Sequence, residues 1–135
     1  MGDLEAYIAR PTPKILMMDD PTRIAALMAE AREAFGDRVS LTCSKPYFLE
    51  VNPPRATKGN ALCWCANHFG FSMERLLAFG DSLNDLSMLL AAGRGVAVQN
   101  AREDVRARIA TVCGSNQQDG VAHYIDQYVL SGGNA

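Results

Sequence analysis

One segment, residues 76–85, constrains what this chain can fold into more than any other. Its sequence is LLAFGDSLND, in which a short apolar run is followed by a glycine and two aspartates. An apolar run of this length predicts a buried strand that ends near Gly80, so that Asp81 follows its carboxyl end. Open α/β sheets bind their ligands at the carboxyl ends of the strands. The segment therefore predicts a functional site directly after a buried strand.

The polar residues of this segment also indicate which chemistry the site suits. Asp81, Asn84 and Asp85 provide oxygen atoms within about one turn, with no cysteine or histidine among them. Such hard ligands suit magnesium and phosphate rather than zinc. An acidic loop that leads into a helix starting near Asp85 explains the same residues without any ligand. From these residues alone both interpretations stay open.

The first part of the chain predicts a small β-α-β-β unit. Asp20 and Pro21 are typical of a helix start and Gly36 of its end, and the residues between them repeat an apolar face. Strands are predicted at residues 14–18, 39–43 and 47–51. The Asn-Pro-Pro-Arg sequence at residues 52–55 interrupts the pattern and is typical of a linker. We therefore predict two modules, residues 1–54 and residues 55–135.

The second module alternates helices and strands. A helix is predicted from Thr57 and Lys58 to Gly70, and the strand of residues 76–80 follows it. Asn100 and Glu103 have the spacing of a capping box, and Asp119 stands where it can cap a last helix. The other predicted elements are a helix ending before Gly93, strands at residues 95–98 and 111–113, and a helix over residues 121–130. This alternation predicts an α/β fold with a parallel sheet.

Composition excludes several classes of function. The net charge of −2 over 135 residues provides no basic surface for nucleic acid or for an anionic membrane. The apolar runs are far shorter than the roughly 20 residues that a membrane span needs. Asp3 and Glu5 stand where a signal peptide would be basic. The four cysteines lack the spacing of a metal site, so we interpret them as free thiols and expect a cytoplasmic protein.

Four further motifs give the chain a family resemblance. They are ATKGNAL at residues 56–62, GVAVQNA at 95–101, NQQDGVA at 116–122 and PYFLEV at 46–51. Together with GDSLND, in this order and spacing, they resemble the Cof-type branch of the haloacid dehalogenase (HAD) superfamily of phosphatases. The resemblance covers nearly the whole chain but corresponds only to the C-terminal half of such a protein. It implies a partial HAD-like, Rossmannoid core preceded by a fragment of the β-α-β-β cap.

The resemblance also implies roles for single residues. Asp81 would be a direct Mg²⁺ ligand, and Asp85 either a second ligand or an orienter of metal-bound water. Lys58 matches the family's phosphate-facing lysine, and Asn84 would donate a hydrogen bond to a phosphate oxygen. Lys58, Asp81 and Asp85 are thus the expected catalytic residues. Without the resemblance, a solvated lysine at a helix start is the preferred interpretation of Lys58.

The sequence departs from the family in what it lacks. Family members carry an Asp-x-Asp-Gly-Thr-like segment whose first aspartate attacks phosphorus, and no such segment occurs in these 135 residues. Asp19-Asp20-Pro21-Thr22 is the nearest mimic, and we interpret it as a helix cap. We therefore expect this chain alone to bind magnesium weakly and not to turn over phosphate esters. We also expect an exposed edge beside the strand of residues 76–80, covered by another chain through dimerisation or strand exchange.

Two hypotheses of function follow from this departure. The chain is either the C-terminal portion of a magnesium-dependent phosphatase of small phosphorylated metabolites, or a non-catalytic, truncated paralogue that acts as an oligomeric or ligand-binding module. The sequence does not specify the substrate, because in this family the cap and its loops select it.

Overall fold

The computed structural model describes residues 11–131 of the chain. These residues form two compact units, one that extends to Ala56 and one that begins at Thr57. Each unit has its own sheet, and the two are described separately below. Within residues 11–131, none of the helices is both long enough and apolar enough to cross a lipid bilayer.

The first unit is a three-stranded antiparallel sheet with one long helix. Its elements are β1 (Ile15–Met18), α2 (Pro21–Phe35), a 3₁₀ turn (Gly36–Arg38), β2 (Ser40–Thr42) and β3 (Phe48–Asn52), and the strand order is β1-β3-β2. Helix α2 begins where the sequence predicts, because the Asp20 carboxylate accepts the N–H of Thr22 at 2.9 Å. Ile24 on the helix and Leu49 on the central strand are fully buried. The predicted β-α-β-β order is thus confirmed.

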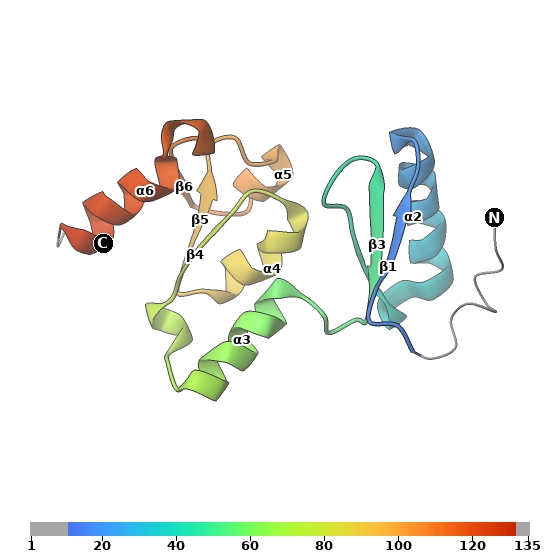
Figure 1. Ribbon diagram of the computed structural model, residues 1–135, viewed down its shortest axis with the longest axis horizontal. Helices are drawn as coiled ribbons and strands as arrows, with labels where there is room; N and C mark the ends of the chain where they lie inside the picture. Colours follow the sequence, from blue (N-terminus) through green and yellow to red (C-terminus); the bar gives the residue numbers. More distant parts are fainter. Residues whose placement is uncertain (1–10, 132–135) are drawn as a thin grey trace. The chain divides into compact units, whose positions relative to one another are not determined.

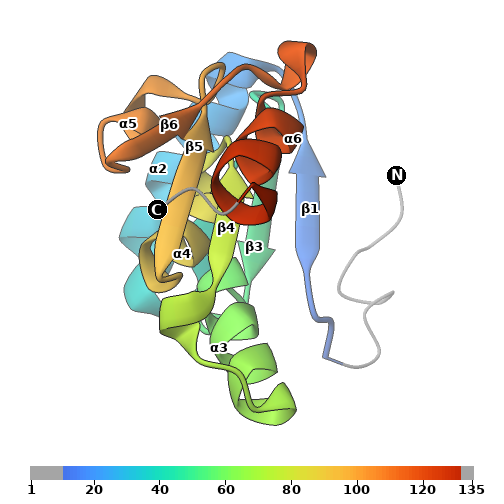
Figure 2. The ribbon, with the colours of Figure 1, turned by 90° about the vertical axis from the view of Figure 1, so that its left-hand side faces the viewer.

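The second unit is a parallel sheet with helices on both faces. Its elements are α3 (Lys58–Phe69), a 3₁₀ turn (Met73–Arg75), β4 (Leu77–Gly80), α4 (Leu83–Ala91), β5 (Arg94–Val98), α5 (Glu103–Arg106), β6 (Thr111–Cys113), a 3₁₀ turn (Asn116–Gln118), α6 (Gly120–Ile125) and η4, a π-helical turn (Asp126–Leu130). The strand order is β4-β5-β6, with both pairs parallel. Figures 1 and 2 show α4 against one face of the sheet and α6 against the other. The predicted α/β fold with a parallel sheet is confirmed.

The core of the second unit lies around the central strand. Val96 and Ala97 on β5 have no exposed surface, as expected for a strand that is covered on both faces. Leu89 of α4 packs on one side, while Val105 of α5 and Tyr124 of α6 complete the cluster. This core fixes where the carboxyl ends of the three strands lie, and therefore where a site can form.

Both ends of α3 agree with the sequence. The Thr57 hydroxyl accepts the N–H of Asn60 at 3.2 Å, which caps the start of the helix. Gly70 ends it in the left-handed conformation, with φ of 74°. Lys58 is therefore the first residue of the helix.

Two predicted helix starts in the second unit are wrong, and a third, at Asp119, has the predicted position but lacks the expected side-chain hydrogen bond. Helix α4 begins at Leu83, two residues before the predicted Asp85, because Ser82 occupies the cap position. Helix α5 begins at Glu103 after Arg102, so Asn100 and Glu103 do not form a capping box. Asp119 precedes α6 but makes no capping hydrogen bond from its side chain, since it adopts the left-handed conformation with φ of 52°. Helix α4 thus starts at a local capping box formed by Ser82 and Asp85.

Candidate active site at the end of strand β4

The structure brings three of the predicted site residues together at the carboxyl end of β4. The strand ends at Gly80, Asp81 follows, and α4 begins two residues later. Asp85 is the third residue of α4, and Lys58 reaches it from the start of α3. Figure 1 shows α3 and α4 as neighbouring helices of the second unit. Residues 27 positions apart in the sequence thus form one cluster.

Asp85 is the best-connected residue of this cluster. Its Oδ1 pairs with the Lys58 ammonium. Its Oδ2 accepts the N–H of Asp81 at 3.1 Å and the N–H of Ser82 at 3.2 Å. The Asp85 side chain is only 7% exposed, whereas that of Lys58 is 50% exposed. A carboxylate can be buried in this way because each of its two oxygen atoms faces a hydrogen-bond donor.

A glycine allows this carboxylate to approach the strand. A Cβ atom added at Gly80 would lie 2.6 Å from Cβ of Asp85 and 3.0 Å from its Cγ. Contacts this short do not occur between real side chains, so any larger residue at position 80 would displace Asp85. Gly80 is therefore required for the packing of Asp85 as well as for the turn after β4.

The surroundings of Asp85 change its acidity. Burial on its own would raise the pKa of the carboxyl group, but the hydrogen bond from Lys58, the two from backbone N–H groups and the lysine charge together outweigh it. The pKa of Asp85 therefore lies below its ordinary value, which is about 4. Asp85 is ionised at neutral pH and carries a fixed negative charge opposite the lysine.

This shift predicts how the stability depends on pH. Because the pKa is lower in the folded than in the unfolded state, the stabilisation is fully present above about pH 4 and disappears as the pH falls through the folded-state pKa. We expect Asp85→Asn to lower the free energy of unfolding by about 2 kcal/mol at pH 7, because it removes hydrogen bonds to a charged group. Urea unfolding of both proteins between pH 7 and pH 2.5 measures the difference, which should shrink toward low pH. Asp126→Asn, at an exposed aspartate of the same unit, is the control, and an equal pH dependence in that variant would contradict the assignment.

Asp81 is more accessible than Asp85. It is exposed, and among residues 11–131 its Oδ1 accepts only the Ser82 hydroxyl, at 3.3 Å. Its backbone carbonyl accepts the N–H of Arg102 at 2.9 Å, which fixes the turn from which the side chain projects. Of the two aspartates, Asp81 is thus the one with carboxylate capacity left for a cation.

Asn84 lies in the first turn of α4, between these aspartates. Its side-chain Oδ1 is buried and has no hydrogen-bond partner in the described part of the chain. A buried acceptor without a partner is uncommon, and it indicates a place where a water molecule or a ligand belongs. Asn84 is thus a neighbour of the two aspartates along the chain, and its amide oxygen has no protein partner within the described residues.

Sequence reasoning missed a second set of polar contacts along the same edge of the sheet. The Asn100 side chain, which follows β5, accepts the Ser115 hydroxyl at 3.1 Å and the N–H of Asn116 at 3.0 Å. These bonds join the chain after β5 to the chain after β6. The available signal was a polar residue directly after each strand, because parallel strands end at one edge of the sheet.

The oxygen atoms of this cluster are of the kind that binds magnesium. Within residues 11–131, no group of three or more histidine, cysteine, aspartate or glutamate side chains could hold a metal ion. Magnesium needs fewer protein ligands, since it is usually bound by one or two carboxylates together with water and substrate phosphate. Asp81, with Asp85 beside it, meets that requirement, whereas residues 11–131 offer no ligand set of the zinc type.

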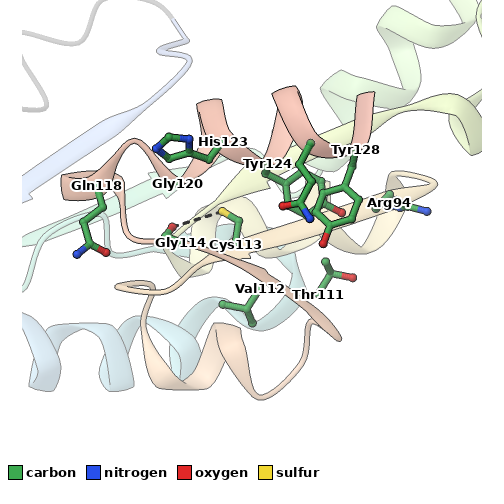
Figure 3. Close-up of a pocket in the computed structure, with 11 residues that line it drawn as sticks. Arg94, Thr111, Val112, Cys113, Gly114, Gln118, Gly120, His123, Tyr124 and Tyr128 are labelled. Carbon is green, nitrogen blue, oxygen red and sulfur yellow. Dashed lines mark hydrogen bonds between the residues drawn. The ribbon is translucent and has the colours of Figure 1, made fainter. Parts of the chain in front are cut away.

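A separate cavity lies away from this cluster. It has a volume of about 790 Å³ and runs along β6 and α6, where Arg94, Cys113, His123 and Tyr128 line it (Figure 3). Lys58, Asp81, Asn84 and Asp85 are not among its lining residues, which include no carboxylate in the described part of the chain. The carboxylates of the β4 cluster therefore have no counterpart among the described residues that line this cavity.

Comparison with known proteins shows to which family the chain belongs. A model of haloacid dehalogenase-like hydrolases matches residues 3–125. The chain belongs to this family. A solved haloacid dehalogenase-like hydrolase from B. subtilis is 30% identical and superposes with a TM-score of 0.81, over 96% of this chain and 46% of that one. The predicted HAD-like fold is thus confirmed.

Two curated relatives illustrate the match in sequence. The HMP-PP phosphatase of Enterobacter sp. (strain 638) is 32% identical over 131 residues, which cover 96% of this chain and 48% of that protein. The chloroplastic endoribonuclease YBEY of Arabidopsis thaliana is 38% identical over 119 residues, 87% of this chain but 20% of that protein. The haloacid dehalogenase-like chain therefore spans less than half the length of these relatives. The resemblance to Cof-type phosphatases is confirmed.

Proposed function

We propose that this haloacid dehalogenase-like chain supplies the metal- and phosphate-facing part of a magnesium-dependent phosphatase that acts on small phosphorylated metabolites. The observation that supports this proposal is the Lys58–Asp85 pair beside the exposed carboxylate of Asp81. A cation, an ammonium group and carboxylates at one strand end are what phosphoryl transfer requires for positioning and charge neutralisation. The four free cysteines support a reducing, cytoplasmic location.

The geometry favours different roles for the two aspartates. Asp81 is the proposed direct ligand of Mg²⁺, because its carboxylate is exposed. Asp85 is the proposed orienter, because both of its oxygens already accept hydrogen bonds. When bound, Mg²⁺ would neutralise negative charge on the phosphoryl group that is transferred. Lys58, half exposed, would add a second positive charge on the same side, and Asn84 would bind a phosphate oxygen.

The nucleophile in this proposal comes from polypeptide outside these 135 residues. Strand β4 supports it, because β4 is the edge strand of its sheet and pairs only with β5 within the described residues. The backbone groups on its other side are available to a further parallel strand. We propose that another polypeptide provides this strand and places an aspartate beside Asp81; a second copy of this chain, by strand exchange, would cover the edge but supply no nucleophile.

Co-expression tests this proposal directly. The chain is produced alone and together with the part of the Enterobacter relative that it does not span, which is about half of that protein. We expect the two polypeptides to co-purify and to hydrolyse p-nitrophenyl phosphate only with Mg²⁺, because neither alone holds both the nucleophile and the metal ligands. Gel filtration and a phosphate-release assay with and without EDTA are the measurements.

Two results would contradict the proposal. Hydrolysis by the chain alone would mean that the nucleophile lies within these residues. A complex that forms and binds Mg²⁺ without hydrolysing any phosphate ester would favour the non-catalytic module instead. The same experiment therefore separates the two hypotheses.

A further inference from the structure

Helices α3 and α4 cross very closely at one point. The N–H of Gly59 donates to the Ser87 hydroxyl at 3.1 Å. A Cβ atom at Gly59 would lie 2.6 Å from the backbone oxygen of Ser87 and 2.8 Å from its carbonyl carbon. These neighbours are backbone atoms of a helix and do not move aside, so only a hydrogen atom fits at position 59.

The hydrogen bond at this crossing satisfies a group that a helix cannot satisfy itself. The first N–H groups of any α-helix lack intrahelical acceptors. Thr57 caps α3 by accepting the N–H of Asn60, but the N–H of Gly59 still needs an acceptor from outside the helix. Its acceptor is a serine of the next helix, so the start of α3 is capped partly by its own residues and partly by α4.

The crossing involves residues that directly follow, or nearly follow, the two members of the ion pair in the sequence. Gly59 follows Lys58 directly, and Ser87 lies two residues after Asp85. A lysine side chain is long and flexible, and the Lys58 side chain is half exposed, so nothing in the side chain alone selects the Asp85 carboxylate over water. What restricts Lys58 is the position of its own backbone.

We propose that the Gly59–Ser87 contact is the positioning device that sets Lys58 against Asp85. Gly59 and Ser87 touch no reacting group in this proposal, and they act by fixing the start of α3 one residue from the lysine. A role of this contact in catalysis depends on the function proposed above. Its role in fixing the position of Lys58 does not, because that role concerns only residues of this chain.

A double-mutant cycle tests the proposal in the full chain. Lys58→Met, Asp85→Asn and the double variant give the coupling between the pair, which we expect to be roughly three- to tenfold in the unfolding constant. In a Ser87→Ala background we expect the coupling to fall below about twofold, because α3 then starts without its tether. Urea unfolding at pH 7 without metal or substrate provides every value.

Matched controls separate positioning from loss of stability. Ser72→Ala also removes a serine hydroxyl that accepts one backbone N–H, that of Glu74, but lies outside the crossing. We expect its background to leave the coupling unchanged. A Gly59→Ala variant that folds should show no coupling between Lys58 and Asp85. Its control is Gly70→Ala, at the other end of α3, because a Cβ atom there meets nothing within 4 Å.

The outcomes are distinct from those of the phosphatase test. Full coupling in the Ser87→Ala background would overturn the proposal, whether or not Gly59→Ala folds. Equal loss of coupling in the Ser72→Ala and Ser87→Ala backgrounds would also overturn it, since stability alone would then explain the effect. Loss confined to Ser87→Ala, in a complex that does not hydrolyse phosphate esters, would uphold the positioning and refute only the proposed function.

Discussion

Replacing Gly95 by alanine is expected to lower the free energy of unfolding of the second unit by about 3 kcal/mol or more. Gly95 lies on β5, the central strand, and a Cβ atom there would be 2.1 Å from the backbone oxygen of Leu89 and 2.7 Å from its carbonyl carbon. Leu89 belongs to α4 and is itself buried, so relief requires that the whole helix move off the sheet. Because natural domains are stable by only about 5–15 kcal/mol, this change removes a large share of the total.

The control for this substitution is Gly70→Ala. Gly70 has φ of 74° and open space around its missing Cβ, so the alanine variant loses only conformational preference. We expect a cost of about 1 kcal/mol for that variant. Urea unfolding followed by circular dichroism measures both. Equal midpoints for the two variants would contradict the close packing of α4 on β5.

Local patterns in the sequence predicted most of the elements around these glycines. The start of α3 follows from Thr57 and its end from Gly70, since both act through bonds to residues within four positions. The parallel sheet follows from the alternation of apolar runs with helical segments. These features depend on neighbours in the chain, which is why a single sequence contains enough information for them.

The features that sequence reasoning missed depend on distant partners or on a backbone conformation that the local pattern does not specify. Asn100 was predicted to cap a helix, but Ser115 and Asn116, fifteen and sixteen residues away, engage its side-chain oxygen. Asp119 was predicted to cap α6, but its left-handed backbone leaves its carboxylate without a capping bond. For Asn100 the contacts along the sheet edge thus prevail over a local rule for helix starts, and for Asp119 the conformation of its own backbone does.

The candidate site could be predicted from the sequence only in part. The sequence alone identifies Asp81 and Asp85 as carboxylates after a strand, but Lys58 joins them only through the crossing of two helices. That crossing needs a glycine at position 59, and this need can be recognised only when the position of the α4 backbone is known. The family resemblance predicted that Lys58 belongs to the site, whereas the contact that holds it there required the structure.

The largest effect on function is expected for Asp81→Asn. In the co-expressed complex, we expect this change to lower kcat/KM for p-nitrophenyl phosphate roughly a thousandfold, because the proposed direct ligand loses its charge and the transferred phosphoryl group loses its neutralising cation. Its free energy of unfolding should change by less than about 0.5 kcal/mol, since the Asp81 side chain is exposed and accepts a single long hydrogen bond. Asp85→Asn should differ by losing stability as well as activity.

This contrast distinguishes a ligand from a structural carboxylate. Asp126→Asn, at an exposed aspartate of the same unit, should retain both activity and stability. Magnesium titrations of the complex followed by the rate of hydrolysis should show that D81N needs at least about tenfold more Mg²⁺, since a lost carboxylate costs a cation at least 1.4 kcal/mol of binding. If D81N hydrolyses the ester normally at the same Mg²⁺ concentration, Asp81 is not the ligand, and the charge at the end of β4 then serves only to hold the turn.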